Sequence, residues 1–299
     1  KKEMKNILII GANGFTGRRI LNDLSVNPIY HVTGCSLRDD ICPGKDYRFV
    51  RTDIRDENEV RKLFKECRPD IVINTSALSV PDYCETHHTE AEATNVTAVE
   101  TIAHVCEQYG SRFIHLSTDF VFDGKSTRLY KEEDEAIPVN YYGVTKLKAE
   151  KIIASICSNY AIVRVVVVYG KALPGQHGNI LQLVANRLRN GETIRVVSDQ
   201  WRTPTFVGDI SVGVEKLMFH TANGIYHICG SECLTIAEIA YRVADFLKLD
   251  RSLIEPVTTE EMKEVTPRPR FSGLSIEKAK AEIGYTPRTL EEGMEASLF

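Results

Sequence analysis

The segment NILIIGANGFTG, residues 6–17, decides the fold. It is a short apolar run that ends in a glycine-rich turn and continues into a segment with helical spacing, residues 15–25. In such a unit Gly11 makes the tight turn, Gly14 lets the backbone approach a pyrophosphate, and Gly17 lets the helix pack closely on the sheet. The helix N-terminus then faces the phosphate charge. The segment predicts a dinucleotide site, and a glycine turn with only a folding role is the alternative.

The first half of the chain alternates strand-like and helix-like segments. Apolar runs such as residues 70–77 and 112–118 are separated by segments with helical periodicity, the longest of which spans 90–110 and ends at a glycine. Near-continuous apolar strands between helices are typical of a parallel sheet covered on both faces, which predicts a doubly wound α/β (Rossmann) fold. Further strands are expected at 6–10, 31–36, 48–50, 161–170 and 224–230, and further helices at 15–25, 57–67, 179–190 and 235–247.

After Gly170 the pattern becomes loop-like and irregular. We therefore expect residues 1–170 to form an NADP(H)-binding Rossmann domain, completed by a strand and helix near 205–222. Residues 171–299 are expected to form mostly a smaller substrate-binding lobe built from separate pieces of the chain.

Composition argues against several classes of protein. The 299 residues are 43% hydrophobic and 26% charged, with a net charge of −4 and no long basic run, which does not suit a nucleic-acid binder. No apolar run approaches the roughly 18 residues of a membrane span. The start, KKEMKNILII, runs directly into a strand and leaves no room for a secretory signal. The eight cysteines show no CxxC pair and no metal-ligand spacing, which predicts reduced thiols, a cytoplasmic protein and no metal.

The end of the second expected strand bears on which dinucleotide is bound. An NAD enzyme usually places an acidic residue there, whereas this strand ends in Ser36, followed by Arg38. With Arg18 just after the last glycine, a serine and two arginines suit a 2′-phosphate. NADP(H) is therefore favoured, and NAD(H) stays open because Asp39 could take its ribose. Asp53, after the third strand, could meet the adenine edge.

The segment NYYGVTKLKAE, residues 140–150, contains a candidate proton-transfer pair. Tyr142 and Lys146 are four residues apart and share one helix face, whereas Tyr141 points elsewhere. A nearby ammonium stabilises a phenolate and lowers the tyrosine pKa toward neutrality. Thr118, at the carboxyl end of a strand, could hydrogen-bond the same carbonyl oxygen that Tyr142 protonates, because open α/β sheets bind ligands at that edge. A plain helix surface is the alternative reading of the Tyr–Lys spacing alone.

Taken together, these motifs resemble the extended short-chain dehydrogenases/reductases, and within them the dTDP-4-dehydrorhamnose reductase group. The resemblance covers essentially the whole chain. It rests on GANGFTG, RPDIVIN, STDFVFDG, NYYGVTKLKAE, DQWRTPT (199–205), GIYHICG and RPRFSGL (268–274).

The resemblance implies a reaction and a set of residues. NADPH would reduce the 4-keto group of a 6-deoxy sugar on a nucleotide carrier, as in dTDP-L-rhamnose biosynthesis, with Thr118, Tyr142 and Lys146 as the catalytic triad. The implied cofactor-binding residues are Gly11, Asn13, Gly14, Phe15, Thr16, Gly17, Ser36, Arg38, Asp53, Ile54, Ser76, Ala77, Tyr142 and Lys146. The implied substrate-binding residues are Asp119, Phe120, Val167, Trp201, Thr203, Pro204 and Arg268.

Three departures from the family pattern concern the sugar pocket. Phe120 stands where the family usually has a tyrosine, and Val167 replaces a usual aromatic. The segment ALSVPDYCE at 77–85 also differs from the family's histidine-containing segment. The resemblance therefore leaves the identity of the sugar open.

A second protein with this fold resembles the chain as well. The regulatory β subunit of methionine adenosyltransferase has a segment much like VTGCSLR at 32–38, and a proline–aspartate where this chain has Pro81 and Asp82. This resemblance implies an NADP-binding partner subunit without turnover. The C-terminal segment LEEGMEASLF, residues 290–299, could help form a homodimer.

Overall fold

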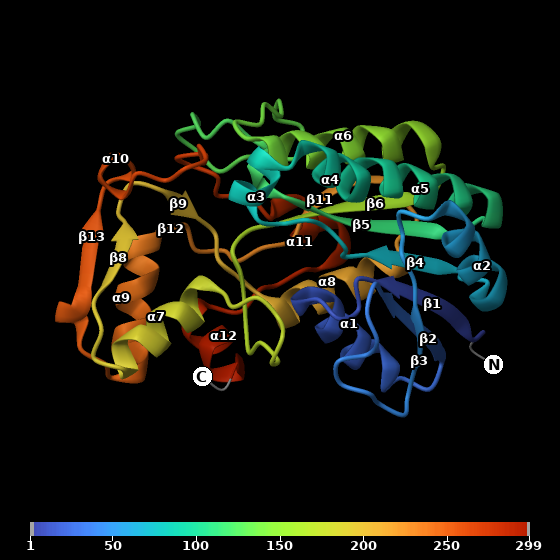
Figure 1. Cartoon of the computed structure of the whole chain (residues 1–299), viewed down its shortest axis with the longest axis horizontal. Helices are drawn as coiled ribbons and strands as arrows, with labels where there is room; N and C mark the ends of the chain where they lie inside the picture. Colours follow the sequence, from blue (N-terminus) through green and yellow to red (C-terminus); the bar gives the residue numbers. More distant parts are fainter. Residues whose placement is uncertain (1–2, 298–299) are drawn as a thin grey trace.

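The protein, described by a computed structural model over residues 3–297, has two parts that lie side by side (Figure 1). The larger part is built on a seven-stranded parallel sheet in the order β11-β6-β5-β4-β1-β2-β3. Because the order runs outward in both directions from β1, it confirms the predicted doubly wound α/β fold. The strands are β1 (Lys5–Ile10), β2 (Tyr30–Ser36), β3 (Arg48–Arg51), β4 (Ile71–Asn74), β5 (Arg112–Thr118), β6 (Tyr160–Val165) and β11 (Gly224–His227).

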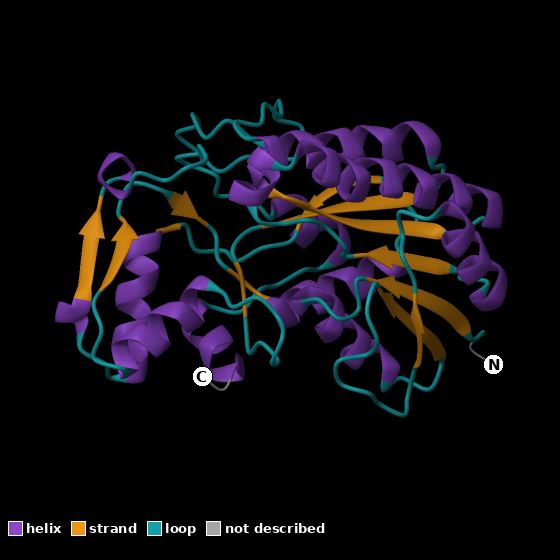
Figure 2. Ribbon diagram, in the orientation of Figure 1, coloured by secondary structure: helices purple, strands orange, loops and turns teal. Residues whose placement is uncertain are grey.

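Helices cover both faces of this sheet (Figure 2). Leu8 and Val72 share one apolar core with α2, α5 and α6. Ile7 and Ile73, their neighbours along the same strands, belong to the other core, with α1 and α8. Alternate side chains thus enter different cores, which explains why the strands are continuous apolar runs. The helices are α1 (Phe15–Ser25), α2 (Glu57–Cys67), α5 (Ala98–Tyr109), α6 (Tyr141–Ile156) and α8 (Val207–Met218).

The smaller part has an apolar core of its own. In it β8 (Ile194–Val197) pairs with β13 (Ile254–Val257), and α7 (Ile180–Arg189) packs against α9 (Ile236–Leu247). Thr235 caps the start of α9, because its side chain accepts a hydrogen bond from the Glu238 amide. The remaining elements after residue 250 are η3 (Arg251–Leu253), α10 (Thr259–Met262), α11 (Glu277–Ile283) and α12 (Leu290–Ser297).

The C-terminal half also returns to the large sheet. After β10 (Thr205–Phe206), α8 packs on α1, β5 and β6, and β11 adds the seventh strand beside β6. The division of the chain at residue 170 stays a prediction, as does a homodimer. Residues 298 and 299, at the end of the segment considered for a dimer, lie outside the described residues.

The strand expected at 161–170 is two strands. β6 ends at Val165, and β7 (Val168–Tyr169) leaves the sheet to pair with β10. Between them Val167 has φ 36°, a left-handed conformation that is rare for a β-branched residue. Thr205 holds this bend, because its amide donates to the Val167 carbonyl at 3.0 Å and its hydroxyl donates to the Val166 carbonyl at 2.5 Å.

The long helix expected at 90–110 also differs in detail. It begins as α4 (His88–Glu92), passes through one π-helical turn, η1 (Ala93–Thr97), and continues as α5 to Gly110. Asn95 lies inside the π turn, and its side chain bonds both the amide and the carbonyl of Leu78. This turn therefore anchors the loop that follows β4.

The sequence predicted no membrane span, no metal site and reduced cysteines, and residues 3–297 show the following. In this range we find no helix with the length and apolarity needed to cross a bilayer. The same residues contain no cluster of three or more His, Cys, Asp or Glu side chains arranged to hold a metal ion. All eight cysteine thiols are free.

Candidate functional site

The glycine turn between β1 and α1 has the shape that a bound phosphate requires. Gly11 has φ 82°, and a Cβ there would lie 2.7 Å from Thr75 Oγ1. A Cβ on Gly17 would overlap the Gly11 carbonyl oxygen. In the described chain no side chain caps α1, which starts after Gly14, so its first amides remain available to an anion.

A cavity of about 210 Å³ lies beside this turn at the carboxyl ends of β1 to β4. Six predicted cofactor residues line it together: Gly11, Ser36, Asp53, Ile54, Ser76 and Ala77. The open helix N-terminus and this polar cavity therefore fit a dinucleotide. Phe15 and Thr16 form the first turn of α1 but do not line this cavity, and Phe15 packs against the apolar core of the smaller part.

The structure separates the two arginines that were considered for a 2′-phosphate. Arg18 is buried and paired with Asp40 at 2.5 Å, and it also donates to Tyr47 Oη at 2.8 Å. Asn13 fixes the neighbouring loop by donating to the carbonyl oxygens of Arg38 and Asp39 at 3.3 and 2.9 Å. Arg18 therefore stabilises the loop after β2, and Arg38 is the arginine left beside Ser36.

The catalytic candidates meet at the carboxyl edge of the sheet. Thr118 ends β5, and Tyr142 lies in the first turn of α6, which Asn140 caps by accepting from the Gly143 amide at 2.8 Å. Gly143 permits close packing, because a Cβ there would overlap the carbonyl oxygen of Phe120. The start of α6 therefore sits directly on the turn η2 (Asp119–Val121) that follows Thr118. Sequence reasoning did not single out Asn140 and Gly143, although both lie beside Tyr142 in the quoted motif.

Lys146 is almost completely buried one turn along α6. Its Nζ donates to the carbonyl oxygen of Leu116 at 2.8 Å. Burial lowers its pKa to about 8, although the carboxylate of Glu150 acts in the opposite direction. Lys146 therefore carries its charge around neutral pH but lies close to losing it.

The pKa of Tyr142 is raised, in contrast to the lowering expected from its spacing to Lys146. Burial is the main cause, and the negative charge of Asp119 adds to it, while a hydrogen bond with Thr118 acts against both. The phenol is therefore protonated at neutral pH, which suits a proton donor. Tyr141 is engaged elsewhere, because its hydroxyl donates to Glu92 Oε2 at 2.8 Å and its ring stacks on His88.

A cavity of about 830 Å³ opens in front of these residues, between the strand ends and the smaller part. Tyr142 and Thr118 line its inner side. Of the predicted substrate residues, Asp119, Phe120, Val167 and Arg268 also line it. Segments that are far apart in the chain thus form one site.

Three predicted substrate residues do not reach this cavity. Thr203 is fully buried, and its hydroxyl donates to Cys229 Sγ at 3.3 Å. Pro204 packs against Gly230, where a Cβ would overlap the Pro204 carbonyl oxygen. Trp201 pairs with Thr235 across β9 (Trp201–Arg202) and β12 (Leu234–Thr235), and carries the Arg270 guanidinium over its ring at 5.4 Å. These residues join the two parts instead of lining the cavity.

Arg202 was missed, although it lies inside the quoted DQWRTPT segment. It lines the cavity while 2% exposed, with Nε 3.9 Å from Asp119 Oδ2 and its guanidinium over the Phe120 ring at 5.6 Å. Asp119 also accepts from Ser272 Oγ at 2.5 Å. The one sequence signal for Arg202 was its position between Trp201 and Thr203, which were both predicted to bind substrate. Other missed lining residues are Ser79, Asn179, Arg195, Gln200, Lys263 and Glu264.

Arg268 connects the two sides of the cavity. Its guanidinium lies 3.5 Å from Asp82 on α3 (Pro81–Thr86) and 3.0 Å from Glu264 in the smaller part. Pro81 and Asp82, noted above as a departure from the reductase pattern, both line the cavity. This departure therefore lies at the same cavity as Thr118 and Tyr142.

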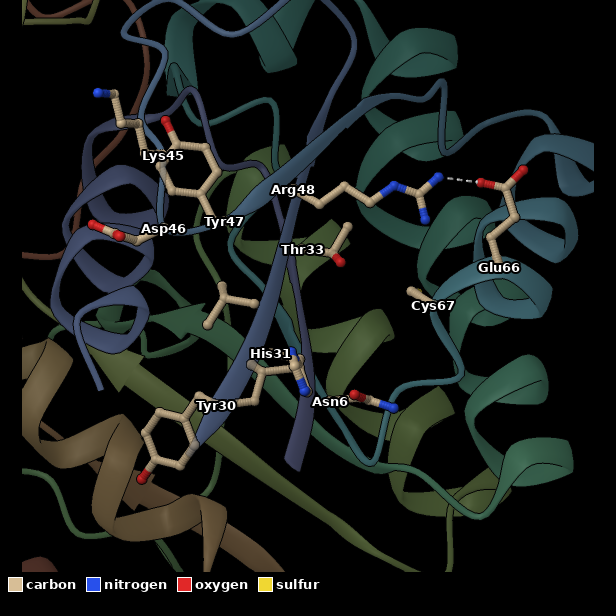
Figure 3. A pocket seen from close by; sticks show the side chains of 12 residues that line it. Asn6, Tyr30, His31, Thr33, Lys45, Asp46, Tyr47, Arg48, Glu66 and Cys67 are labelled. Atoms are coloured by element: carbon tan, nitrogen blue, oxygen red, sulfur yellow. Dashed lines mark hydrogen bonds and ion pairs between the residues drawn. The ribbon is translucent and has the colours of Figure 1, made fainter. Parts of the chain in front are cut away.

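A third cavity, of about 390 Å³, lies at the opposite ends of the strands (Figure 3). It is bordered by the starts of β1, β2 and β3 and by the end of α2, where Arg48 pairs with Glu66 at 2.7 Å. Open α/β sheets bind their ligands at the carboxyl edge, so this cavity is not the candidate site.

The parallel sheet, the glycine turn and the Tyr–Lys helix at the carboxyl edge define an extended short-chain dehydrogenase/reductase. Residues 4–298 match the family model described as the RmlD substrate binding domain. The chain belongs to this family.

Similar proteins include both enzymes and a subunit. A probable low-salt glycan biosynthesis reductase of Haloferax volcanii is 30% identical, over 96% of this chain and 95% of the relative. The methionine adenosyltransferase 2 subunit beta of Xenopus laevis is 31% identical, over 95% of this chain and 84% of the relative. The dTDP-4-dehydrorhamnose reductase of Bacillus anthracis, solved in complex with NADP, is 26% identical, with a TM-score of 0.86 and 99% of each chain covered.

Proposed function

We propose that this chain is an NADPH-dependent reductase of the 4-keto group of a nucleotide-linked 6-deoxy-hexulose. The observation that carries the proposal is the meeting of Thr118 and Tyr142 in one large cavity, with Lys146 one helical turn behind Tyr142. Membership of a family that includes nucleotide-sugar reductases agrees with it. The dTDP-4-dehydrorhamnose reductase activity is the specific form that we propose.

The chain's own residues would divide the work as follows. The amides at the start of α1, together with Ser36 and Arg38, hold the phosphates and ribose of the dinucleotide. A nicotinamide held there would supply the hydride for the carbonyl carbon. Tyr142 Oη donates its proton to the carbonyl oxygen as negative charge develops there, and Thr118 Oγ1 donates a hydrogen bond to the same atom.

The surroundings support this proton transfer. The Lys146 ammonium stabilises the phenolate that remains on Tyr142 after the transfer. The phenol is protonated beforehand, because burial and, to a smaller extent, the charge of Asp119 raise the pKa of Tyr142. Phe120 and Val167 border the cavity with apolar surface and exclude water from the reacting carbonyl.

The basic residues of the smaller part suit the anionic carrier of such a substrate. Arg195, Lys263 and Arg268 line the outer region of the cavity. Arg268 is shared between Asp82 and Glu264 in this structure, and a diphosphate would compete with both carboxylates for its guanidinium.

The test is NADPH oxidation, followed at 340 nm, with dTDP-4-keto-6-deoxy-L-lyxo-hexulose generated in situ. We expect turnover that depends on both the sugar and the chain. A known reductase in parallel controls for the substrate supply. Oxidation by the control and none by this chain would refute the proposal for that sugar, and a panel of other nucleotide-linked keto sugars would then test the wider class.

A second candidate is favoured by the 31% identity to the methionine adenosyltransferase subunit. In this case the chain would bind NADP and serve as a regulatory partner without turnover. It predicts tight NADPH binding with no oxidation of any keto sugar, and a stable complex with a methionine adenosyltransferase catalytic subunit on size-exclusion chromatography. Sugar-dependent oxidation of NADPH would exclude a purely regulatory role.

A further inference from the structure

A row of polar side chains is buried beneath α6, and one of them, Ser117, also borders the large cavity of the candidate site. Ser117, Arg164 and His227 lie in register on the adjacent strands β5, β6 and β11. They are 4%, 2% and 0% exposed, and Glu150 of α6, which packs onto them, is 3% exposed. Four buried polar groups between a helix and a sheet need a physical reason.

The carboxylate of Glu150 is the centre of this row. Arg164 grips it with two bonds, from Nη2 to Oε1 at 2.6 Å and from Nε to Oε2 at 3.1 Å. Ser117 Oγ donates to Oε2 at 2.5 Å. Arg164 Nη1 lies 3.3 Å from His227 Nε2, so the guanidinium also has a partner on β11. Both oxygens of Glu150 are therefore held in one orientation.

Stability alone does not account for such a pair. Removing two charges from water costs several kcal/mol per ion, and replacing a buried ion pair with apolar side chains is often neutral or stabilising. What the pair does supply is geometry, because a forked arginine–carboxylate bond fixes both angle and distance. It fixes α6 against β5 and β6.

The position of Glu150 connects this geometry to the candidate site. Glu150 follows Lys146 by four residues and Tyr142 by eight, so all three lie on one face of α6. On the sheet, Ser117 directly precedes Thr118. The bonds of Glu150 therefore set the rotation and depth at which α6 presents Tyr142 to Thr118.

Glu150 also acts on the charge of Lys146. Its carboxylate raises the pKa of Lys146 against the lowering by burial. His115 on β5 is kept neutral, because burial and the Lys146 charge lower its pKa well below the usual value. Further charged or titratable groups lie on the elements around this end of α6: Arg164 on β6, Asp119 on η2, Asp82, Tyr83, Cys84 and Glu85 on α3, and His88, Glu90 and Glu92 on α4.

We propose that Glu150, held by Arg164 and Ser117, is a positioning residue that fixes the catalytic face of α6. The same carboxylate favours the charged form of Lys146. The inference rests on the proposed function for its catalytic consequence. Its structural and electrostatic part concerns the chain alone and can be measured without substrate.

The experiment compares three variants of the full chain. Glu150→Gln removes the charge and keeps the size of the side chain, Glu150→Asp keeps the charge, and Glu150→Leu with Arg164→Met replaces the whole pair by apolar side chains. Asp209→Asn is the matched control. Asp209 is a buried carboxylate on α8, on the opposite face of the sheet, and it accepts a hydrogen bond from Arg288 at 2.8 Å. Each variant is measured for Tm, for kcat and KM of NADPH oxidation across pH, and for the Lys146 titration.

The Lys146 titration is followed by NMR of lysine labelled with ¹³C at Cε, without cofactor or substrate, and assigned with Lys146→Arg. In Glu150→Gln we expect its midpoint to fall by about one pH unit. We expect kcat to fall about 10- to 100-fold with little change in KM, and the upper pH limit of kcat to move down with the titration. In Glu150→Asp, which keeps the charge, the falls in the Lys146 midpoint and in kcat should both be smaller than in Glu150→Gln. Asp209→Asn should lower Tm alone.

The double apolar variant separates positioning from folding. We expect it to fold with a Tm near that of the wild type and still to lose kcat. An unchanged Lys146 midpoint in Glu150→Gln, or a double variant with wild-type kcat, would overturn the inference. The Lys146 midpoint could shift in Glu150→Gln while the wild-type chain turns over no keto sugar. That result would refute the proposed function and leave the electrostatic role of Glu150 standing.

Discussion

The two cavities at the carboxyl edge of the sheet are built in different ways. The cofactor-side cavity is formed by short segments that follow β1, β2, β3 and β4 in order, and much of its shape comes from backbone and small side chains. The substrate-side cavity combines the ends of β5 and β6, the start of α6 and loops of the smaller part as far as Arg268. Chain separated by more than 180 residues meets there.

This difference predicts how each side fails. Damage on the cofactor side should be steric, since the turn at Gly11 and Gly17 leaves no room for added atoms. Damage on the substrate side should be chemical, because single functional groups such as the phenol of Tyr142 have no substitute nearby. The predictions below begin with the largest expected effect.

Tyr142→Phe removes one oxygen atom from the substrate side. We expect kcat for keto-sugar reduction to fall by about 10²- to 10⁴-fold, because the proton donor is lost, while NADPH binding remains. Tyr141→Phe is the matched control and should keep its rate, since the Tyr141 hydroxyl is bonded to Glu92. Rates are measured by stopped-flow and steady-state NADPH oxidation. Equal rates for Tyr142→Phe and wild type would show that the substrate-side cavity does not depend on the phenol of Tyr142.

Lys146→Met tests the energetic cost of the buried charge. The pKa of Lys146 falls from 10.5 to about 8 on folding, so between these values the unfolded chain binds more protons and the stability of the wild type rises with pH. Relative to Lys146→Met, the wild type should gain about 2–3 kcal/mol in free energy of unfolding between pH 7 and pH 10.

Urea denaturation at several pH values measures this gain. Lys148→Met is the control, because Lys148 is exposed and pairs with Glu92 at 3.2 Å on the outer side of α6. The Lys148→Met and wild-type curves should run parallel. A stability difference between wild type and Lys146→Met that stays constant with pH would show that Lys146 is not buried as a charge.

Gly17→Ala tests the steric character of the cofactor side. The added methyl would overlap the Gly11 carbonyl oxygen, so the turn must open. We expect a loss of about 1–3 kcal/mol in stability and NADPH binding weaker by roughly 10- to 100-fold, measured by fluorescence titration. Gly178→Ala is the control, since a Cβ at Gly178 meets nothing within 4 Å. Unchanged NADPH affinity in Gly17→Ala would contradict a phosphate site at this turn.

Ser36→Asp tests cofactor choice, with the smallest expected effect of the four. A carboxylate beside a 2′-phosphate repels it, whereas a ribose hydroxyl can donate to it. The ratio of NADPH to NADH affinity should fall by about 10-fold. Asp39→Asn is the comparison variant, and it should leave the ratio unchanged unless Asp39 takes the ribose of NAD. A ratio that responds only to Asp39→Asn would reassign the cofactor to NAD.

Residues with local consequences could be predicted from the sequence. The bounds of α1, α2 and β5 agree with the expected segments 15–25, 57–67 and 112–118, because strong apolar periodicity and flanking breakers define them. The glycine turn was predicted correctly for the same reason, as its geometry depends on a few consecutive residues. The choice of Tyr142 over Tyr141 also followed from helical spacing alone, and the two hydroxyls do lie in different environments.

Other features could not be read from local patterns. Val165 to Val168 looks like continuous strand, but pairing of β7 with β10 and the bonds from Thr205 bend the chain at Val167. The position of Arg18 after the last glycine favours a phosphate contact, but Asp40 and Tyr47 enclose its guanidinium. In each case the deciding partner lies more than 20 residues away in the chain.

By itself, the sequence determined the parallel sheet, the order of its elements, the glycine turn and the Tyr142–Lys146 pair, because each depends on periodicity or on residues within two helical turns. Tertiary structure alone decided that Arg202 and Asp82 border the cavity while Thr203 and Pro204 are buried beneath it. It also decided that Glu150 meets Arg164 under α6. The physical reason is that burial, pKa and contact depend on what packs against a side chain, and that partner comes from a distant strand, helix or loop.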